Sequence, residues 1–376
     1  MNIAMFYHSL VSDWNHGNAH FLRGIVSELI SRGHEVTVYE PVNAWSRWNL
    51  VERHGPGPIE QFHQAYPELT SIPYQQDDLD LEEVADEADL VIVHEWSDDW
   101  LINGWNKLRA QRSDFRLLFH DTHHRAVSDP RALGRVNLSA YDGILAFGEV
   151  LREVYRTNGW GQSAWTWHEA ADTRMFHPLP ASEKDTELVW IGNWGDDERT
   201  QELEEFLFSP ARQLGIRLRL HGVRYPEGVL ERLAAQGVEY GGWLPNFKVP
   251  QAFARAKVTV HVPRRPYTRL LQGIPTIRPF EALACGIPLV CAPWNDREHL
   301  FTPGKDYLVA HDGEEMKRHL RQLLNEPDFA QELATHGRNT ILSRHTCAHR
   351  IDELLAICRT LGLTESEPRS KLATVG

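Results

Sequence analysis

Short apolar runs alternate with amphipathic stretches through the first part of the chain. Five apolar runs predict strands, at residues 1–7, 34–40, 90–94, 116–120 and 143–147. Apolar residues at helical spacing predict a helix over residues 20–32 that ends at Gly33. Apolar strands separated by helices are typical of a parallel sheet covered on both faces. Residues 45–80 are rich in Pro, Gly, Trp and His without a clear period, and we expect an irregular insertion there.

A second series of strands and helices follows a proline-containing segment, Met175–Lys184. Its apolar runs predict strands at residues 188–191, 217–222, 238–241, 257–262 and 288–291. Helices are predicted at residues 198–208, 229–236, 250–256 and 279–285. Two α/β halves joined in this way imply a cleft between them. The sequence therefore predicts domains at residues 1–175 and 176–345, a helix at 346–362 that returns to the first domain, and a disordered tail at 363–376.

Charge and cysteine usage narrow the possible partners and the compartment. The 376 residues carry a formal net charge of −13, which argues against a nucleic acid or an anionic membrane surface as the partner. No run of about 18 apolar residues occurs, so we expect no membrane span. The four cysteines form no CxxC pair, and the first residues lack the pattern of a signal peptide. These features favour structural thiols in a cytoplasmic protein over a disulfide framework or a zinc site.

Polar residues at the carboxyl ends of predicted strands are the first candidates for chemistry, because ligands of open parallel sheets bind there. Gly17 and Asn18 precede a helix whose first amides can approach an anion, and His20 can act as a base or contact the donor. The alternative is an ordinary helix-start turn with a solvated histidine. His94 and Glu95 follow an apolar run and should face the cleft, where an imidazole beside a carboxylate suits acid–base chemistry.

A third cluster at a strand end, residues 119–124, contains Asp121 and three histidines. Such a cluster suggests a metal, but its members are consecutive in sequence. His120 and His124 are four residues apart, but they close a predicted strand, and this spacing places two histidines on one face only in a helix. We therefore expect polar side chains that line the cleft, and no metal site.

A basic stretch, residues 263–269, leads toward a short helix that begins near Pro279, a residue suited to the first helical position. Arginines and a helix N-terminus together can hold a diphosphate, and Arg278 stands at this N-terminus. Glu281, one turn into the helix, can accept hydrogen bonds from a ribose diol. The alternative is a surface loop whose arginines pair with the excess carboxylates.

The sequence RPFEALACGIP at residues 278–288 resembles the FEALACGxP signature of GT-B glycosyltransferases, in the form found in the CgeB-like (spore maturation protein) branch of the group 1 type. Residues 31–38 and 89–96 resemble other conserved junctions of these enzymes. Gly192 and Asn193, followed by Arg199, resemble the glycine loop and basic residue that open the donor domain. One departure is clear: retaining members carry another glutamate eight positions before the one matched by Glu281, and this chain has Gly273 there.

The resemblance implies two Rossmann-like domains of the GT-B fold that face a cleft, with a nucleoside-diphosphate sugar held by the second domain. It matches Glu281 to a ribose ligand, Arg199 and Arg278 to positions near the diphosphate, and His94 to a histidine near the transferred sugar. The implied activity is metal-independent and cofactor-free sugar transfer from this donor to an unidentified acceptor, which can be a small molecule, a glycan or another molecule.

The stereochemical outcome stays open at this stage. An inverting enzyme needs a base for the acceptor hydroxyl, and His20, Glu95 and Asp121 are the candidates. A retaining enzyme needs no such base. Two other functions are compatible with the sequence: a nucleotide-sugar epimerase of the same architecture, and a non-catalytic protein that binds nucleotide sugars, which the glycine at position 273 suggests.

Overall fold

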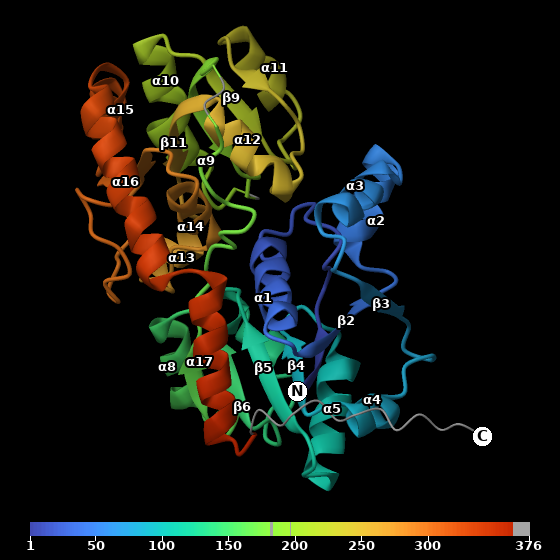
Figure 1. The fold of residues 1–376 in the computed structure, drawn as a ribbon. Coiled ribbons are helices and arrows are strands. Elements are labelled where there is room, and N and C mark those ends of the chain that lie inside the picture. The colour runs from blue at the N-terminus through green and yellow to red at the C-terminus, as the bar shows by residue number, and fades with distance from the viewer. Residues whose placement is uncertain (181–182, 196, 364–376) are drawn as a thin grey trace.

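Two parallel β-sheets form the framework of the protein in the computed structural model, which describes residues 1–180, 183–195 and 197–363 (Figure 1). The first sheet has seven strands in the order β3-β2-β1-β4-β5-β6-β7. They are β1 (Asn2–Phe6), β2 (Glu35–Pro41), β3 (Ser71–Tyr74), β4 (Leu90–His94), β5 (Arg116–Asp121), β6 (Gly143–Ala146) and β7 (Ala164–Thr166). All neighbouring strands of this sheet are parallel, and the five strands predicted from apolar runs are all present.

The second sheet has six strands in the order β10-β9-β8-β11-β12-β13 and is also parallel. They are β8 (Thr186–Ile191), β9 (Leu218–His221), β10 (Glu239–Tyr240), β11 (Ala256–His261), β12 (Leu289–Cys291) and β13 (Leu308–Val309). The chain passes from the first sheet to the second between residues 166 and 186, and the predicted domain boundary falls inside this connection. The fold class predicted from the sequence, two α/β domains with parallel sheets, is confirmed.

Eight helices accompany the first sheet in the described part of the chain. They are α1 (Ala19–Ser31), α2 (Trp45–His54), α3 (Gly57–Ala65), α4 (Leu81–Glu87), α5 (Asp99–Gln111), α6 (Arg125–Ser128), α7 (Pro130–Leu133) and α8 (Glu149–Asn158). The expectation of an irregular insertion at residues 45–80 was wrong, since this region holds α2, α3 and β3. The helical period is hidden because α2 buries only Ser46 and Leu50, while Trp48 on the same helix is exposed.

The helices of the second domain follow the predicted order with shifted ends. They are α9 (Thr200–Leu203), a π-helical turn η1 (Glu204–Phe208), α10 (Ser209–Leu214), α11 (Val229–Ala235), a 3₁₀ turn η2 (Asn246–Lys248), α12 (Val249–Ala254), α13 (Arg265–Arg269), α14 (Ile277–Ala284), α15 (Gly313–Asn325) and α16 (Pro327–Arg344). Two predictions need correction. Helix α14 starts at Ile277, so Pro279 is its third residue, and part of the predicted basic loop forms the short helix α13.

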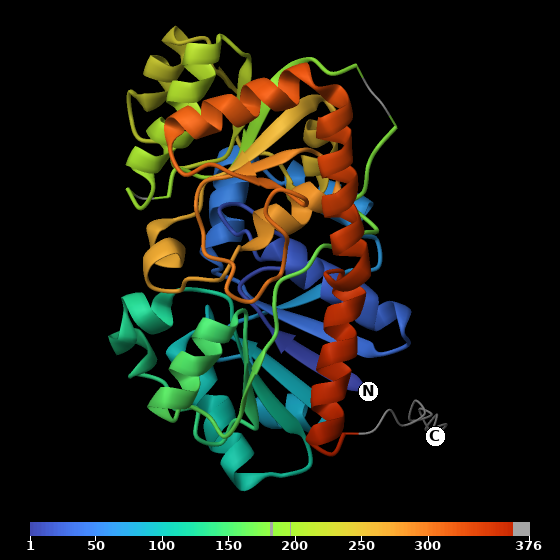
Figure 2. The same ribbon diagram turned by 90° about the vertical axis from the view of Figure 1, so that its left-hand side faces the viewer.

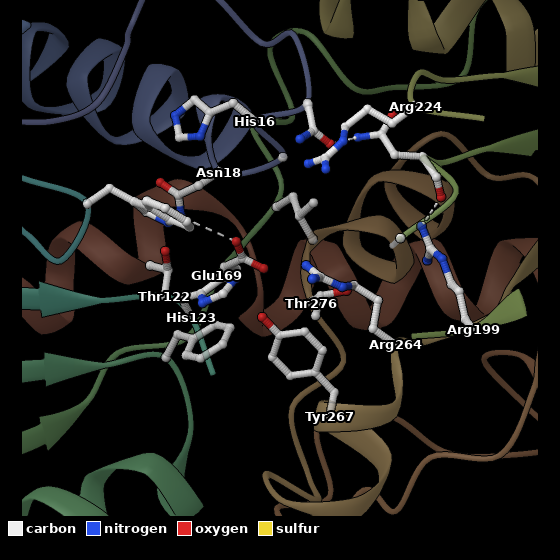
Figure 3. A pocket seen from close by; sticks show the side chains of 17 residues that line it. His16, Asn18, Thr122, His123, Glu169, Arg199, Arg224, Arg264, Tyr267 and Thr276 are labelled. Carbon is white, nitrogen blue, oxygen red and sulfur yellow. Dashed lines mark hydrogen bonds between the residues drawn. The ribbon is translucent and has the colours of Figure 1, made fainter. Parts of the chain in front are cut away.

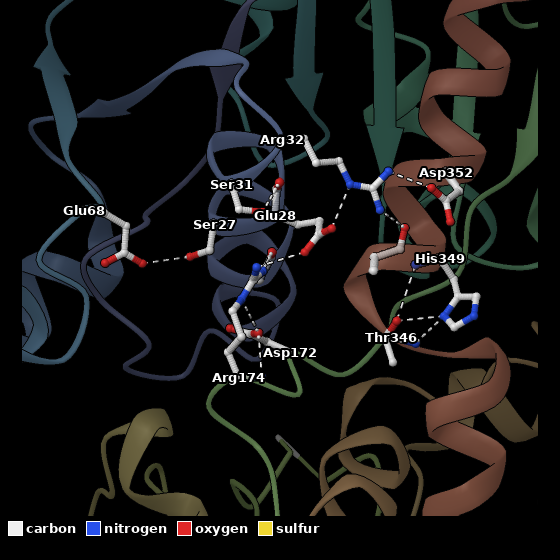
Figure 4. A network of polar contacts seen from close by, with 12 residues as sticks. Ser27, Glu28, Ser31, Arg32, Glu68, Asp172, Arg174, Thr346, His349 and Asp352 are labelled. Atoms are coloured by element: carbon white, nitrogen blue, oxygen red, sulfur yellow. Dashed lines mark hydrogen bonds and ion pairs between the residues drawn. The ribbon is translucent and has the colours of Figure 1, made fainter.

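The last helix, α17 (Cys347–Thr360), returns to the first domain and packs beside α1, as Figures 1 and 2 show. Gly24 permits this close approach, because a Cβ atom at this position would lie 2.4 Å from Sγ of Cys347. Arg32, which follows α1, donates to Asp352 (2.6 Å) and to the backbone oxygen of Ala348 (Figure 4). The tail predicted to be disordered lies, apart from Leu363, outside the described residues.

The two chain crossings between the domains are joined to each other. Ala171 and Thr346 form an isolated parallel β-bridge, in which the amide of Ala171 donates to the backbone oxygen of His345 (3.0 Å) and the amide of Cys347 donates to that of Ala171 (3.0 Å). One cluster of buried apolar side chains also includes residues of both domains and of α17, among them Leu22, Phe280 and Ile351. The two domains therefore share a continuous core.

The loop between β1 and α1 contacts the second domain directly. The carboxylate of Asp13 accepts hydrogen bonds from the indole of Trp243 (3.1 Å) and the backbone amide of Asn246 (3.0 Å), and it also pairs with Arg23 of α1 (2.8 Å). Next to it, the side-chain amide of Asn193 donates to the side chain of Asn15 (2.5 Å). These contacts fix the loop that carries Gly17 and Asn18 against the donor-side domain.

Candidate functional site

A cavity of about 330 Å³ lies between the two domains, and Figure 3 shows the side chains that line it. The first domain and the following connection contribute Asn15, His16, Gly17, Asn18, Trp96, Thr122, His123, Phe147 and Glu169. The second domain contributes Asn193, Gly195, Arg199, Arg224, Arg264, Tyr267, Thr276 and Ile277. The wall from the second domain is cationic, with three arginines, and the opposite wall carries histidines, amides and one carboxylate.

Arg199 is the most buried of these arginines, with 9% of its surface exposed. Its guanidinium donates to the backbone oxygens of Val262 (2.9 Å) and Asn193 and lies over the ring of Trp190. Burial, with the neighbouring Arg264 as a second cause, lowers the pKa of Arg199 to about 10, so it remains a cation at neutral pH. Among the described residues no carboxylate forms an ion pair with Arg199, so its charge is available to an anion in the cavity.

Two helix N-termini also face the cavity. Thr276 and Ile277 begin α14, and Gly17 and Asn18 precede α1. Neither N-cap residue, Thr276 or Asn18, uses its side chain to bond the first amides of its helix. Free amides and the helix dipole both favour an anion at such a position.

The backbone around the cavity is strained. Asn15 (φ 49°), Arg224 (φ 62°) and Thr276 (φ 59°) all line the cavity and adopt the left-handed region. This conformation is costly for any residue with a Cβ atom and most of all for a β-branched threonine. Such strain persists where the surrounding structure holds the backbone, and it is common at functional sites.

Glu281, predicted to bind ribose, borders neither this cavity nor a neighbouring one. Its side chain is 0% exposed, and its carboxylate accepts a hydrogen bond from Asn246 (2.7 Å), pairs with Arg278 and lies 3.0 Å from Nδ1 of His20. Burial alone would raise the pKa of Glu281, but the charge of Arg278 and the contacts with His20 and Asn246 outweigh it and lower the pKa. Ribose binding by Glu281 stays a prediction, and it requires one of these partners to give up its contact.

His20 was predicted as a cleft base, and its position differs from that expectation. It is buried between the domains, where Nε2 accepts a hydrogen bond from the backbone amide of Asp172 (2.9 Å) and Nδ1 faces Glu281. Both ring nitrogens are therefore engaged by the protein. The residue two positions earlier, Asn18, is the one whose side chain reaches the cavity.

His94 and Glu95 lie one layer behind the cavity wall instead of facing the cleft. Nε2 of His94 is 3.0 Å from the hydroxyl of Thr122, and Thr122 and Trp96 form the wall in front of it. Nδ1 of His94 is 2.9 Å from the Glu95 carboxylate. Burial is the main cause of both pKa shifts: it lowers the pKa of His94 to about 3 and raises that of Glu95 to about 8. Burial thus favours the uncharged form of both side chains.

Asp121 is also turned away from the main cavity. Its carboxylate accepts hydrogen bonds from the hydroxyl of Tyr155 (2.7 Å) and the amide of His123 (2.9 Å). Burial, followed by the charge of Glu95, raises the pKa of Asp121 to about 7. Glu95 and Asp121 instead border a small cavity of about 40 Å³ inside the first domain.

A third cavity, of about 70 Å³, adjoins the main one in the second domain. Gly192 and Arg278, predicted to hold the donor, border it, while Asn193 and Gly17 border both cavities. Its other lining residues include Ile191, His221, Trp243, Leu244 and Val249. Apolar and aromatic side chains of this kind suit a planar base, next to the cationic cavity.

Several residues of the main cavity were not predicted as site residues. Arg264, Tyr267 and His123 belong to segments that the sequence had marked as basic or histidine-rich, so their composition was the available signal. Glu169 belongs to no such pattern. It follows β7 in the connection between the domains, and only the fold brings it to the cavity.

The described residues hold neither a cluster of metal ligands nor a helix that could span a membrane. No group of three or more His, Cys, Asp or Glu side chains there could hold a metal ion. Within the same part of the chain, no helix is both long and apolar enough to cross a membrane. The four cysteines are buried and unpaired.

Comparison with solved structures places the chain among GT-B proteins. Sucrose-phosphate synthase from Thermosynechococcus elongatus is similar over 96% of this chain and 99% of its own, with a TM-score of 0.65 and 16% identity. HepE of Anabaena, solved with UDP-glucose, is similar over 96% and 100%, with a TM-score of 0.66 and 14% identity. An α-glucosyltransferase solved with UDP and a 13-mer DNA is similar over 96% of this chain and 99% of its own, with a TM-score of 0.64 and 12% identity. The chain thus has the GT-B fold.

Sequence comparison adds a match in the second half of the chain. Residues 199–356 match the model of a family described as glycosyl transferase-like. The matched segment covers less than half of the chain and contains Arg199, Arg264 and α14. No curated protein matches the chain by sequence. The CgeB-like branch expected from the FEALACGIP segment therefore stays a prediction.

Proposed function

We propose that the protein is a glycosyltransferase that moves a sugar from a nucleoside-diphosphate sugar to an acceptor hydroxyl. The observation that carries this proposal is the interdomain cavity, where a buried arginine without an ion-pair partner among the described residues meets two uncapped helix N-termini. This combination suits a diphosphate better than any other common metabolite group. The match to a glycosyl transferase-like family and the UDP-glucose bound by HepE support the same donor class.

The donor fits the two adjoining cavities in one orientation. The diphosphate would lie near Arg199 and the start of α14, and the base would occupy the smaller cavity beside Trp243 and Leu244. The sugar would then extend toward Asn18 and the first domain. When the bond between sugar and diphosphate breaks, negative charge grows on the diphosphate, and each well-placed donor to that charge is worth about 2.7–4 kcal/mol.

Several narrower features belong to this proposal as expectations. The arginines and helix amides supply positive charge where other enzymes use a divalent ion, so we expect transfer without a metal. We propose a cytoplasmic protein of the CgeB-like branch. The acceptor is a small molecule, a glycan or another molecule. A nucleic-acid acceptor is disfavoured by the net charge of −13, although one neighbour in fold was solved with DNA.

The neighbouring residues Arg264 and Arg265 offer a matched test. Both pair with a glutamate of the preceding segment, Glu198 and Glu202, but only Arg264 lines the cavity. In a thermal-shift screen of nucleoside diphosphates and nucleotide sugars, we expect UDP to raise the melting temperature. Arg264→Gln should weaken UDP binding roughly ten- to a hundredfold, the value of a hydrogen bond to a charged group.

Arg265→Gln is the control and should leave UDP affinity unchanged, measured by calorimetric titration on variants with wild-type melting curves. Equal losses in the two variants would mean that general surface charge, not the cavity, holds the ligand. If no nucleoside diphosphate or nucleotide sugar bound at all, the proposed function would be wrong.

A further inference from the structure

Glu169 occupies a position in the cavity that the rest of the fold determines. It lies three residues after β7, in the connection between the domains. The residues around it are fixed: the indole of Trp167 donates to the backbone oxygen of Arg350 (2.8 Å), and Nε2 of His168 lies 2.8 Å from the Glu298 carboxylate. The Ala171–Thr346 bridge follows immediately. The carboxylate is therefore held in place by contacts on both sides of it in the chain.

The carboxylate itself is largely uncommitted. Only 6% of the residue is exposed, and Oε1 accepts one hydrogen bond, from the side-chain amide of Asn18 at 3.3 Å. Among the described residues no cation forms an ion pair with Glu169. Burial is the main cause that raises its pKa to about 8, and the charges of Glu281 and Glu95 act in the same direction. A carboxyl group with a pKa near the working pH can both take up and release a proton.

The two walls of the cavity differ in the chemistry they offer. Figure 3 shows Glu169 on the side of Asn18 and His123, while Arg199 and Arg224 lie on the other side. A sugar whose diphosphate contacts the arginines would present the opposite face of its anomeric carbon toward Glu169. Such an arrangement would suit an in-line displacement, in which the base stands across from the leaving group.

We propose that Glu169 is the catalytic base that activates the acceptor hydroxyl, so that transfer inverts the configuration of the anomeric carbon. The inference rests on the proposed function and names a residue for it. The hydroxyl proton passes to the Glu169 carboxylate as the hydroxyl oxygen bonds to the anomeric carbon. The bond between that carbon and the diphosphate oxygen breaks, and its electron pair leaves with the nucleoside diphosphate. Glu169 then returns the proton to solvent.

Other titratable groups of the site are less suited to this step. His20 has both nitrogens engaged, and Asp121 and Glu95 border a different cavity. His123 lines the main cavity, but burial and the neighbouring His124 lower its pKa to about 2, so it is a very weak base. Of these five residues, only Glu169 lines the main cavity with a carboxylate oxygen, Oε2, that accepts no hydrogen bond from another side chain of the described residues.

The test compares two nucleophiles in the wild type and in Glu169→Gln, with UDP-glucose as the donor. Water must lose a proton to attack, whereas azide carries no proton and needs no base. Glutamine preserves the size of the side chain and the acceptor for Asn18. We expect Glu169→Gln to slow UDP release with water roughly a hundred- to ten-thousandfold, as for loss of a general base. With azide the rate should stay within about tenfold of the wild type, because the missing step is not required.

Two further measurements separate this role from donor binding or folding. The affinity for UDP should be unchanged in Glu169→Gln, and the glucosyl azide formed from α-linked UDP-glucose should have the β configuration by NMR. Glu40→Gln is the matched control, since Glu40 is buried and hydrogen-bonded to Ser9 and Ser71 outside the cavity. It should behave as wild type with both nucleophiles once its melting curve is shown to be intact.

Distinct results would overturn the proposal. Equal losses with water and azide, or a loss of UDP affinity, would make Glu169 a donor-positioning residue, and an α-glucosyl azide would exclude inversion. Wild-type hydrolysis retained in Glu169→Gln would leave the residue without a role in the reaction. A wild type that neither binds UDP nor releases it from UDP-glucose would instead contradict the proposed function, and this inference with it.

Discussion

Replacing Glu281 by alanine should destabilise the whole protein, because this carboxylate joins the two domains. Its partners come from α1 (His20), from η2 (Asn246) and from its own helix (Arg278), and none of its surface reaches solvent. Glu281→Ala would leave the half-buried guanidinium of Arg278 and the buried side-chain amide of Asn246 without this acceptor. Breaking a buried pair in this way costs about 3–5 kcal/mol. An unfolding entropy of about 2.1 cal/mol/K per residue amounts to about 0.8 kcal/mol/K for 376 residues, so each kcal/mol lowers the melting temperature by about 1.3 °C and a drop of about 4–6 °C is expected.

Calorimetry at pH 7.5 is the primary assay, with two comparison variants. Glu281→Gln keeps an acceptor for Asn246 and should lose less stability than the alanine variant. Glu202→Ala removes the carboxylate of a half-exposed pair with Arg265, and such pairs contribute only about 0–1 kcal/mol. If Glu281→Ala melted within about 2 °C of the wild type, the interdomain role argued from its burial would be wrong. Lost UDP affinity in a variant of normal stability would favour ribose binding instead.

The contact of Glu281 with Arg278 also predicts how the stability of the protein changes with pH. The pKa of Glu281 is lowered in the folded protein, mainly because Arg278 and His20 outweigh the effect of burial. A lowered carboxylate pKa contributes stability above the unfolded value of about 4.3, and this contribution disappears as the pH falls through the folded pKa. The difference in stability between wild type and Glu281→Ala should therefore be constant from about pH 8 to 5 and shrink below about pH 4.

Two other predictions follow from the buried carboxyl groups and the cationic wall. The pKa of Glu95 is raised in the folded protein, so the wild type loses stability as the pH rises from about 4.5 to 8. The melting temperature of Glu95→Gln should therefore increase relative to that of the wild type over this interval. A difference that stayed constant would contradict the raised pKa. Turnover of UDP-glucose should be unchanged by EDTA, measured as UDP release, because arginines and helix amides meet the leaving group; loss on chelation and recovery with Mn²⁺ would show a metal-dependent reaction instead.

Apolar patterning was sufficient to predict most of the sheets, because their strands are buried on both faces. It failed where elements bury little. Helix α2 buries two side chains, and β3 is an edge strand that contains Pro73, so neither produces a clear period. Helix α14 was found because its first turns are almost entirely buried and Gly286 follows it. Its start was misplaced by two residues because a proline is tolerated throughout the first turn of a helix.

The candidate site was predictable only in part, for a related reason. A strand-end rule locates the edge of a sheet but not the direction of each side chain. His94 and Asp121 do end their strands, yet their side chains turn toward Thr122 and Tyr155. Glu169 comes from the connection between the domains, and no local pattern reports which segment of a connection will reach a cavity. Such cavity residues can be identified only from a structure in which the positions of both domains are known.

The bridge between Ala171 and Thr346 has a mechanical consequence. Because both chain crossings are tied at this one point, the domains can separate only by pivoting about it, and translation of one domain past the other is blocked. In any such swing the displacement of a residue grows with its distance from the pivot. Glu169 is two residues from the pivot and would hardly move. Interdomain contacts away from the two chain crossings, such as the hydrogen bond from Trp243 to Asp13, would have to break for a substrate to enter.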